Sequence, residues 1–225
     1  MLQENLIRMY EESFRAHREL PALTDYFKGE TFSYYEMAKE IAKLHLFFKK
    51  AEIRRGDKIA LVGRNNPRWC ITYLATITYG AVILQDFAPA DIVHIVNHSE
   101  SRLLFVGDNY WDIIEEDEIA RIDAVLSLTD FHVIYERRGK SLGVYMRDMV
   151  KNYRAKYKRG FSADDIKYPD IPNDQMVLLN YTSGTTGYSK GVMLTVNNLT
   201  GNVLVAKNAR NTQTGTHYFV RGGRT

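Results

Sequence analysis

The chain has 225 residues, 45% hydrophobic and 25% charged, which is typical of a soluble globular protein of one large domain or one and a half. Its net charge of +3 argues against a nucleic-acid-binding protein, which usually concentrates basic residues far more strongly. One cysteine, Cys70, excludes an internal disulfide, and its apolar helical surroundings predict a buried structural thiol. The acidic N-terminus is unlike a signal peptide and no apolar run reaches the length of a membrane span, so we expect a cytoplasmic protein.

Helix-like and strand-like segments alternate along the chain. Ser33 and Glu36 have the spacing of a capping box at the start of one helix, and Pro67 suits the first turn of another. Hydrophobic periodicity predicts helices over 2–17, 33–48, 65–81, 90–101, 111–121 and 141–158. It predicts strands over 21–27, 56–63, 81–84, 102–108, 123–128 and 174–181. This alternation predicts an α/β fold with a parallel-rich sheet flanked by helices, in which ligands bind beyond the carboxyl ends of strands.

The sequence NYTSGTTGYSKGVMLT, residues 180–195, begins where the last predicted strand ends. Its glycines let backbone N–H groups turn toward an anion and let the anion approach closely. Lys190 adds a mobile positive charge. Four hydroxyl side chains add donors: Thr182, Ser183, Thr185 and Thr186. A flexible surface turn is the alternative, because Gly, Ser and Thr favour turns, but so dense a set of donors between two apolar strands favours a polyphosphate site.

This loop is not the common P-loop, which requires glycine, four residues and then Gly-Lys-Ser/Thr. Counting from Gly184 reaches Ser189 instead of glycine, and Lys190 is followed by Gly191. The glycine-rich loop of protein kinases fits no better.

The stretch YTSGTTGYSKGVMLT resembles the signature loop of the adenylate-forming enzymes, which include acyl-CoA synthetases, luciferases and the adenylation domains of peptide synthetases. Ser189 and Val196 depart from the usual proline and histidine, but neither change removes a phosphate donor. The upstream segments TFSYYEMAKEIAKL, GDKIALVGRNNPRWCITYLATITYGAV and HIVNHSESRLLFVGD share the resemblance. It covers roughly residues 20–206 and is greatest to bacterial long-chain fatty acid–CoA ligases.

The resemblance implies an acid–thiol ligase that activates a long-chain fatty acid to an acyl-adenylate and then to acyl-CoA. It implies ATP, Mg²⁺ and coenzyme A as cofactors and co-substrate, and no nucleic acid as partner. It assigns ATP-phosphate binding to Thr182, Ser183, Gly184, Thr185, Thr186, Gly187 and Lys190. No catalytic residue and no metal ligand is expected within these 225 residues.

By the same resemblance, residues 1–206 form an incomplete N-terminal AMP-binding domain, residues 207–225 a divergent polar tail, and the C-terminal domain is absent. The family's later motifs, which include a ribose-binding Asp and a catalytic Lys, are not found. We therefore expect the isolated chain not to complete the reaction; a non-catalytic nucleotide-binding module and an inert fragment are the alternatives. We also expect the shortened segment GAVILQDFAPADI to disturb the sheet, and an edge strand to remain unpaired.

Three other features carry weaker signals. His94 and His98 have a zinc-compatible spacing, but Ile95 stands where a glutamate would follow and no third ligand is evident, so we expect a helix-surface pair. The segment KNYRAKYKRG, 151–160, is interpreted as a solvated helix face in preference to a contact with nucleic acid or membrane. Of these two contacts, a peripheral membrane contact is the better, because long-chain acyl substrates reside in membranes. The acidic run 115–118 receives no catalytic role.

Overall fold

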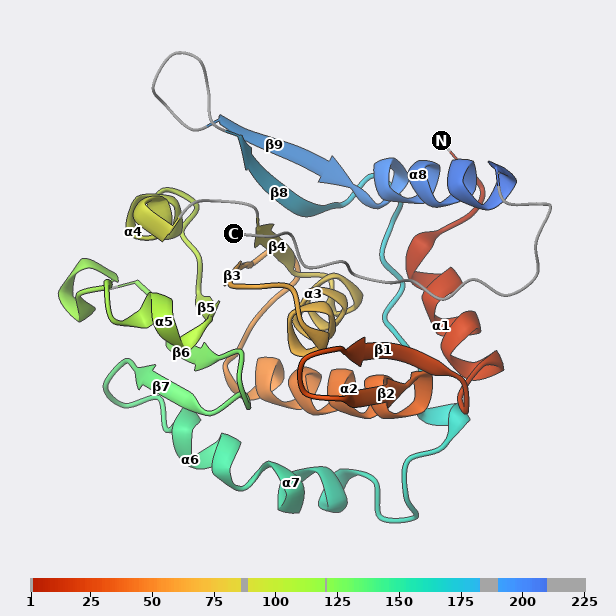
Figure 1. The fold of residues 1–225 in the computed structure, drawn as a ribbon, viewed down its shortest axis with the longest axis horizontal. Helices are drawn as coiled ribbons and strands as arrows, with labels where there is room; N and C mark the ends of the chain where they lie inside the picture. The colour runs from red at the N-terminus through yellow and green to blue at the C-terminus, as the bar shows by residue number, and fades with distance from the viewer. Residues whose placement is uncertain (1, 86–88, 120, 183–189, 210–225) are drawn as a thin grey trace.

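The computed structural model describes residues 2–85, 89–119, 121–182 and 190–209. Its main sheet has seven strands in the order β7-β6-β5-β3-β4-β8-β9 (Figure 1). The five inner strands are parallel, whereas β7 and β9 pair antiparallel at the two edges, which confirms the predicted α/β fold. The strands are β3 Lys58–Val62, β4 Val82–Gln85, β5 Leu103–Val106, β6 Ala124–Ser127, β7 Val133–Glu136, β8 Met176–Thr182 and β9 Lys190–Thr195.

Helices cover both faces of this sheet, and a small antiparallel hairpin lies beside α2 (Figure 1). The helices are α1 Leu6–Ala16, α2 Tyr34–Lys50, α3 Pro67–Tyr79, α4 Ile92–His98, α5 Asp108–Trp111, α6 Leu142–Arg147, α7 Met149–Lys156 and α8 Val196–Ala209. The hairpin consists of β1 Pro21–Asp25 and β2 Glu30–Ser33, and 3₁₀ turns span Pro89–Asp91, Glu116–Ile119 and Ala163–Asp165. No helix within the described ranges is both long enough and apolar enough to cross a bilayer.

Each inner strand contributes to two hydrophobic cores, one on each face of the sheet. In β3, Ile59 and Leu61 join the core formed with α2 and α3, whereas Ala60 and Val62 join the core formed with α4. Because successive side chains of a strand point to opposite faces, a strand buried on both faces must be apolar throughout. This explains the continuous apolar sequences KIALV in β3 and LLFV in β5.

The helix ends follow the local sequence. Ser33 and Glu36 form the predicted capping box of α2, with the Ser33 amide donating to Glu36 Oε2 at 2.9 Å. Asn66 caps α3 by accepting from the amide of Trp69 at 2.8 Å, and Pro67 occupies the first turn as predicted. Gly80 ends α3 with φ +88°, a left-handed conformation that glycine adopts without steric cost.

Several predicted boundaries are wrong. The first helix begins at Leu6, not at residue 2, because Asn5 caps it. The strand predicted over 21–27 ends at Asp25, whose carboxylate accepts from two amides of the following turn. The strands β2 and β7 were not predicted, since each has only four residues and no clear alternation of apolar and polar side chains.

Two predicted helices are also wrong. The described part of the segment 111–121 contains the end of α5 and the 3₁₀ turn Glu116–Ile119. Its buried residues Ile114 and Ile119 are five positions apart, which would place them about 140° apart around an ideal helix. The helix predicted over 141–158 is divided into α6 and α7 at Asp148, a residue type that disfavours helix interiors.

The expectation that the shortened segment after Gly80 disturbs the sheet is wrong. Strand β4 pairs in parallel with β3 on one side and with β8 on the other, and Ile83 lies opposite both Ile59 and Leu178. The edge strand on this side is β9, where Val192 and Met193 are 44% and 69% exposed.

A fully buried carboxylate, that of Asp123, gathers three cations at the amino ends of the parallel strands. Arg102 Nε donates to Asp123 Oδ2 at 3.0 Å, Arg137 donates to Oδ1, and Lys140 Nζ lies 3.5 Å from Oδ1. A buried carboxylate is tolerated only when its charge is compensated in this way.

Arg102 extends this cluster to the end of α2. Its Nη1 donates to Asp57 Oδ2 at 3.1 Å and to the carbonyl of Glu52 at 2.8 Å, and its Nη2 donates to the carbonyl of Ala51 at 3.2 Å. Burial alone would lower the pKa of Arg102, but the hydrogen bonds and charges of Asp123 and Asp57 outweigh it and raise this pKa. The starts of β3, β5 and β6 are therefore joined through one guanidinium group.

We expect Asp123→Ala to lower the free energy of unfolding by about 3 kcal/mol, because it leaves the cations of this cluster without their shared carboxylate. Urea denaturation followed by circular dichroism measures the change. Asp112→Ala, at an exposed carboxylate, is the control and should cost less than about 0.5 kcal/mol. Equal losses in the two variants would show that the cluster does not stabilise the fold.

His45 connects α2 to α3 as a neutral side chain. Its Nε2 lies 3.0 Å from the carbonyl oxygen of Ala75 and 3.1 Å from Thr78 Oγ1, and its ring packs edge-on against Tyr79 and Tyr168. Burial lowers the pKa of His45 to about 4, against a smaller opposite effect from the Ala75 carbonyl.

Because the folded-state pKa of His45 lies below its usual value, protonation favours the unfolded chain and stability falls as the pH drops from 6.5 toward 4. We expect His45 to account for a loss of about 2 kcal/mol over this range, less than the full pKa shift implies because the ring is partly exposed. Thermal unfolding at several pH values should show a flatter profile for His45→Gln than for the parent chain. The profile of His94→Gln, at an exposed helix position, should match the parent.

Candidate functional site

The predicted phosphate-binding loop lies in the sequence between strands β8 and β9, which form a hairpin. Thr182 is the last residue of β8 and Lys190 the first of β9, and the two are paired across the hairpin. Because β8 runs parallel to β4, the loop follows a carboxyl end of the parallel strands, where α/β folds bind ligands. The remaining predicted phosphate ligands, Ser183, Gly184, Thr185, Thr186 and Gly187, lie outside the described residues.

Tyr181, one residue before Thr182, anchors the hairpin to the body of the protein. Its side chain is 5% exposed, its hydroxyl lies 2.9 Å from His98 Nδ1, and the two rings meet edge to face. Burial raises the pKa of the Tyr181 phenol, so the hydroxyl keeps its proton and is available as a hydrogen-bond donor. Helix α4 is thereby joined to the strand that leads into the loop.

Gly191 lies opposite Tyr181 in the hairpin. A Cβ atom at this position would lie 3.0 Å from Leu179 Cδ1 and 3.6 Å from Tyr181 Cζ, closer to Leu179 than ordinary packing allows. The glycine after Lys190 thus lets the Leu179 side chain pack across the hairpin.

The protein-family model described as AMP-binding enzyme matches residues 10–220. This chain belongs to the AMP-binding enzyme family. Over 152 residues it is 30% identical to 4-hydroxybutyrate–CoA ligase 2 of Metallosphaera sedula. This matched region covers 64% of this chain and 26% of the relative. It is 22% identical over 223 residues to a long-chain-fatty-acid–CoA ligase of Escherichia coli, covering 89% of this chain and 38% of the relative. The chain therefore spans less than half the length of these relatives.

Solved structures of similar proteins agree with the AMP-binding fold. The long-chain-fatty-acid–CoA ligase of Archaeoglobus fulgidus has a TM-score of 0.66 at 20% identity, over 90% of this chain and 38% of that one. ATP-bound MatB of Rhodopseudomonas palustris has a TM-score of 0.63 at 21% identity, over 91% of this chain and 37% of that one. At such identities the likeness establishes the fold alone.

Two residues of the AMP-binding sequence match, Thr195 and Asn198, have a structural role after the hairpin. Thr195 precedes α8 and caps it, because its Oγ1 accepts from the amide of Asn198 at 3.3 Å. In return, Asn198 Oδ1 accepts from the Thr195 amide at 2.9 Å and from Thr195 Oγ1 at 2.8 Å. Further along α8, the buried Thr200 Oγ1 accepts from the amide of Leu6 at 3.1 Å. This contact fixes α8 against α1, and the two helices lie next to each other in Figure 1.

The other candidate residues of this AMP-binding chain are placed as follows. The rings of His94 and His98 are 5.8 Å apart on α4, and no cluster of three or more potential metal ligands occurs in the described ranges. Burial raises the pKa of the partly buried Cys70 thiol to about 11, which disfavours the nucleophilic thiolate.

In the segment 151–160, the basic side chains and the tyrosine side chains have different surroundings. Lys151, Arg154 and Lys156 are exposed, whereas Tyr153 and Tyr157 pack against the core with ring centroids 4.9 Å apart. Within α7, the bases up to Lys156 form a solvated face, as predicted, whereas residues 157–160 lie beyond the end of the helix. The acidic run 115–118 is exposed.

The contact between Tyr181 and His98 was missed by sequence reasoning, because the two residues are 83 positions apart and nothing local relates them. We expect Tyr181→Phe and His98→Ala to show a coupling free energy of about 1 kcal/mol in a double-mutant cycle measured by urea denaturation. Pairing Tyr181→Phe with His94→Ala, one turn away on α4, should give no coupling. A coupling indistinguishable from zero for His98 would contradict the anchoring role.

Proposed function

We propose that this chain provides the ATP-phosphate-binding part of an acid–thiol ligase that converts a fatty acid to an acyl-adenylate and then to acyl-CoA. The family membership carries this proposal, together with the hairpin that pairs Thr182 with Lys190 across the predicted loop. Relatives named as acid–CoA ligases support the reaction class, although this chain spans only 26% and 38% of the lengths of two of them.

In this proposal, the residues from Thr182 to Gly187 hold the β- and γ-phosphates of ATP through hydroxyl groups and backbone amides. Lys190 compensates charge on the same phosphates. The carboxylate oxygen of the acid bonds to the α-phosphorus and pyrophosphate leaves; the thiol of coenzyme A then displaces AMP from the acyl carbon. The protein's contribution at this loop is positioning and electrostatic stabilisation of the leaving pyrophosphate.

Mg²⁺ fits this donor set, because hydroxyl groups, amides and a lysine leave phosphate oxygens available to the ion. When bound, the ion would reduce the negative charge on the phosphates. The residues proposed here hold the phosphates, and no carboxylate of this chain is proposed as a metal ligand.

The framework around the loop supports a positioning role. Strand β8 is paired on both sides, with β4 and with β9, and Tyr181 is held by His98. The two ends of the loop are therefore kept in register before any ligand binds. Preorganisation of this kind lowers the entropy that binding must overcome.

A fatty acid is the proposed substrate. Relatives named for long-chain fatty acids match about nine-tenths of this chain, at 89% in Escherichia coli and 91% in Haemophilus influenzae. The shorter match to a 4-hydroxybutyrate–CoA ligase covers 64% of the chain. A membrane-facing role of the exposed bases of α7 is a part of the same proposal, because long-chain acids partition into membranes.

We expect the 225-residue chain to bind Mg-ATP, and Lys190→Ala to weaken this binding roughly tenfold or more, since a charge-assisted contact to phosphate is lost. Isothermal titration calorimetry measures both dissociation constants. Lys207→Ala, at an exposed lysine of α8, removes the same charge away from the loop and should leave binding unchanged. Binding that is equally strong in all three proteins, or absent from the folded parent chain, would refute the proposed phosphate site.

A further inference from the structure

A cavity of about 420 Å³ lies between α2, the β6–β7 turn, α6 and α7. None of its lining residues belongs to the β8–β9 hairpin, and Figure 1 shows α6 and α7 at the opposite side of the molecule from β8 and β9. Its volume is within the range of small-molecule sites. The cavity is thus separate from the β8–β9 hairpin.

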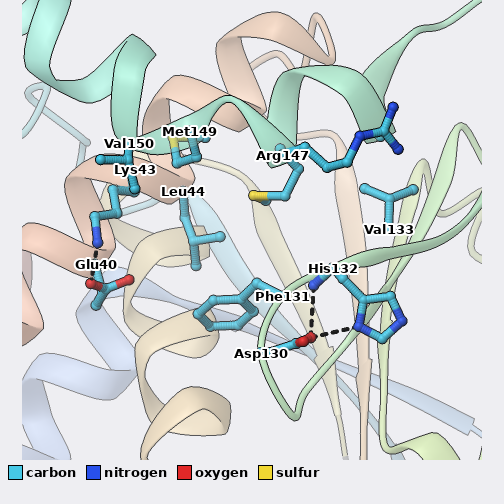
Figure 2. Close-up of a pocket in the computed structure, with 12 residues that line it drawn as sticks. Glu40, Lys43, Leu44, Asp130, Phe131, His132, Val133, Arg147, Met149 and Val150 are labelled. Atoms are coloured by element: carbon cyan, nitrogen blue, oxygen red, sulfur yellow. Dashed lines mark hydrogen bonds and ion pairs between the residues drawn. The ribbon is translucent and has the colours of Figure 1, made fainter.

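The walls of the cavity are mainly apolar and come from different elements. Leu44 of α2, Phe131 of the β6–β7 turn and Met149 of α7 are buried wall residues, and Val133 and Met146 complete the surface. Methionine side chains adapt to the shape of an apolar ligand because they are flexible and polarisable. Figure 2 shows Leu44 and Phe131 facing the middle of this space.

Phe131 adopts an unusual backbone conformation at this wall. Its φ of +67° lies in the left-handed region, which is unfavourable for an aromatic residue outside a special context. Its ring packs edge-on against Phe105 at a centroid distance of 6.0 Å. The fold therefore holds the Phe131 ring between the hydrophobic core and the cavity at a cost in backbone energy.

Both acidic residues that line the cavity already have partners. Glu40 Oε1 lies 2.5 Å from Lys43 Nζ, and Asp130 Oδ1 lies 2.5 Å from His132 Nδ1; Figure 2 shows these two pairs at opposite ends of the cavity. Burial acts to raise the pKa of Asp130, but the hydrogen bonds from His132 outweigh it and lower this pKa. Glu40 therefore has a cationic partner within the cavity wall, and Asp130 is held by hydrogen bonds from the amide and the ring of His132.

Arg147 is different, because no ion pair among the described residues involves it. Its guanidinium borders the space beside Gly143. A Cβ added to Gly143 would lie 3.9 Å from Arg147 Nη1, 3.8 Å from Val133 Cβ and 3.8 Å from Glu136 Oε2, all ordinary contact distances. Glu136 Oε2 already accepts from the amides of Leu142 and Gly143. The exposed Arg147 thus places a cation without an ion pair at the rim of the apolar walls.

We propose that this cavity binds a small amphiphilic carboxylate, with its apolar body against Leu44, Phe131 and Met149 and its carboxylate on Arg147. The planar guanidinium matches a carboxylate with two parallel hydrogen bonds. Arg147 favours an anionic group over a neutral or a cationic one at this end of the cavity. Straight-chain and aromatic acids share the required chemistry. The proposal does not depend on the proposed ligase function.

The test uses the full 225-residue chain carrying ¹³C-methyl methionine, whose seven methionine signals are assigned by single substitutions. Octanoate and benzoate represent the two kinds of acid, and octylamine and octanol are the cationic and neutral controls. We expect one or both acids to shift the Met146 and Met149 methyl signals saturably, with a dissociation constant at least roughly tenfold lower than that of either control. The acid that binds more tightly shows whether the cavity prefers a straight-chain or an aromatic acid.

Two pairs of matched variants test the geometry. Arg147→Gln should weaken acid binding roughly tenfold, while Arg154→Gln, at an exposed arginine of α7, should not change it. Gly143→Leu should block binding by filling the cavity, whereas Val144→Leu, at a half-exposed neighbour on α6, should not. Thermal unfolding confirms that each variant is folded, and substituting leucine for a helix glycine favours the helix.

The result that overturns the proposal is an absence of saturable shifts with both acids, equal binding of octylamine and octanoate, or Arg147→Gln binding that equals that of the parent. Lys190→Ala should leave acid binding unchanged. If Lys190→Ala weakened acid binding as much as Arg147→Gln does, the acid would be bound at the phosphate loop and the cavity proposal would fail. Loss of Mg-ATP binding alone would contradict only the proposed function.

Discussion

The compensation of one buried charge, the carboxylate of Asp123, organises the amino edge of the sheet. Asp123 itself precedes β6, Arg102 precedes β5, Asp57 precedes β3 and Arg137 follows β7, so four strands meet at one ionic cluster. A carboxylate removed from water is stable only while its partners keep their positions. This requirement fixes the positions of the strands relative to one another at their amino ends. The loops at the opposite edge follow the carboxyl ends of the strands.

The alignment of the strands also determines where the candidate site lies. With the strands aligned, β8 returns beside β4, and its carboxyl end is followed by the loop that begins at Thr182. Tyr181 and His98 then bind the hairpin to α4 on the same edge. The phosphate site proposed for this AMP-binding chain therefore depends on two interactions. The ionic cluster of Asp123 aligns the strands at the amino edge of the sheet, and the contact between Tyr181 and His98 holds the hairpin at the carboxyl edge.

The fold also separates two kinds of binding chemistry. The sequence that follows the carboxyl end of β8 is rich in small donors and reaches Lys190, and these residue types are the basis of the proposed phosphate site. The cavity between α2, α6 and α7 combines apolar walls with Arg147, which suits an amphiphilic acid. The two regions lie on opposite sides of the molecule in Figure 1, so a ligand at one need not exclude a ligand at the other.

Local rules in the sequence determined a large part of this structure. The short apolar runs of β3, β5 and β6, each bounded by turn residues, are typical of strands buried on both faces. The caps at Ser33 and Asn66 start their helices through contacts within four residues. The loop sequence after β8 was recognisable because small residues and one lysine in fixed order serve a chemical purpose. Family membership and fold class follow from these signals, since each depends on residues close together in the chain.

Other features depended on contacts between distant residues, and only the tertiary structure decided them. Strands β2 and β7 are too short to show a pattern, and they form because a partner strand offers hydrogen bonds. The helix expected over 111–121 gave way to a turn because Ile114, Ile119 and Ile122 are buried by neighbours that the local sequence does not contain. The pairing of Tyr181 with His98 and the cluster around Asp123 join segments far apart in the chain, and their energies depend on burial, which no local pattern encodes.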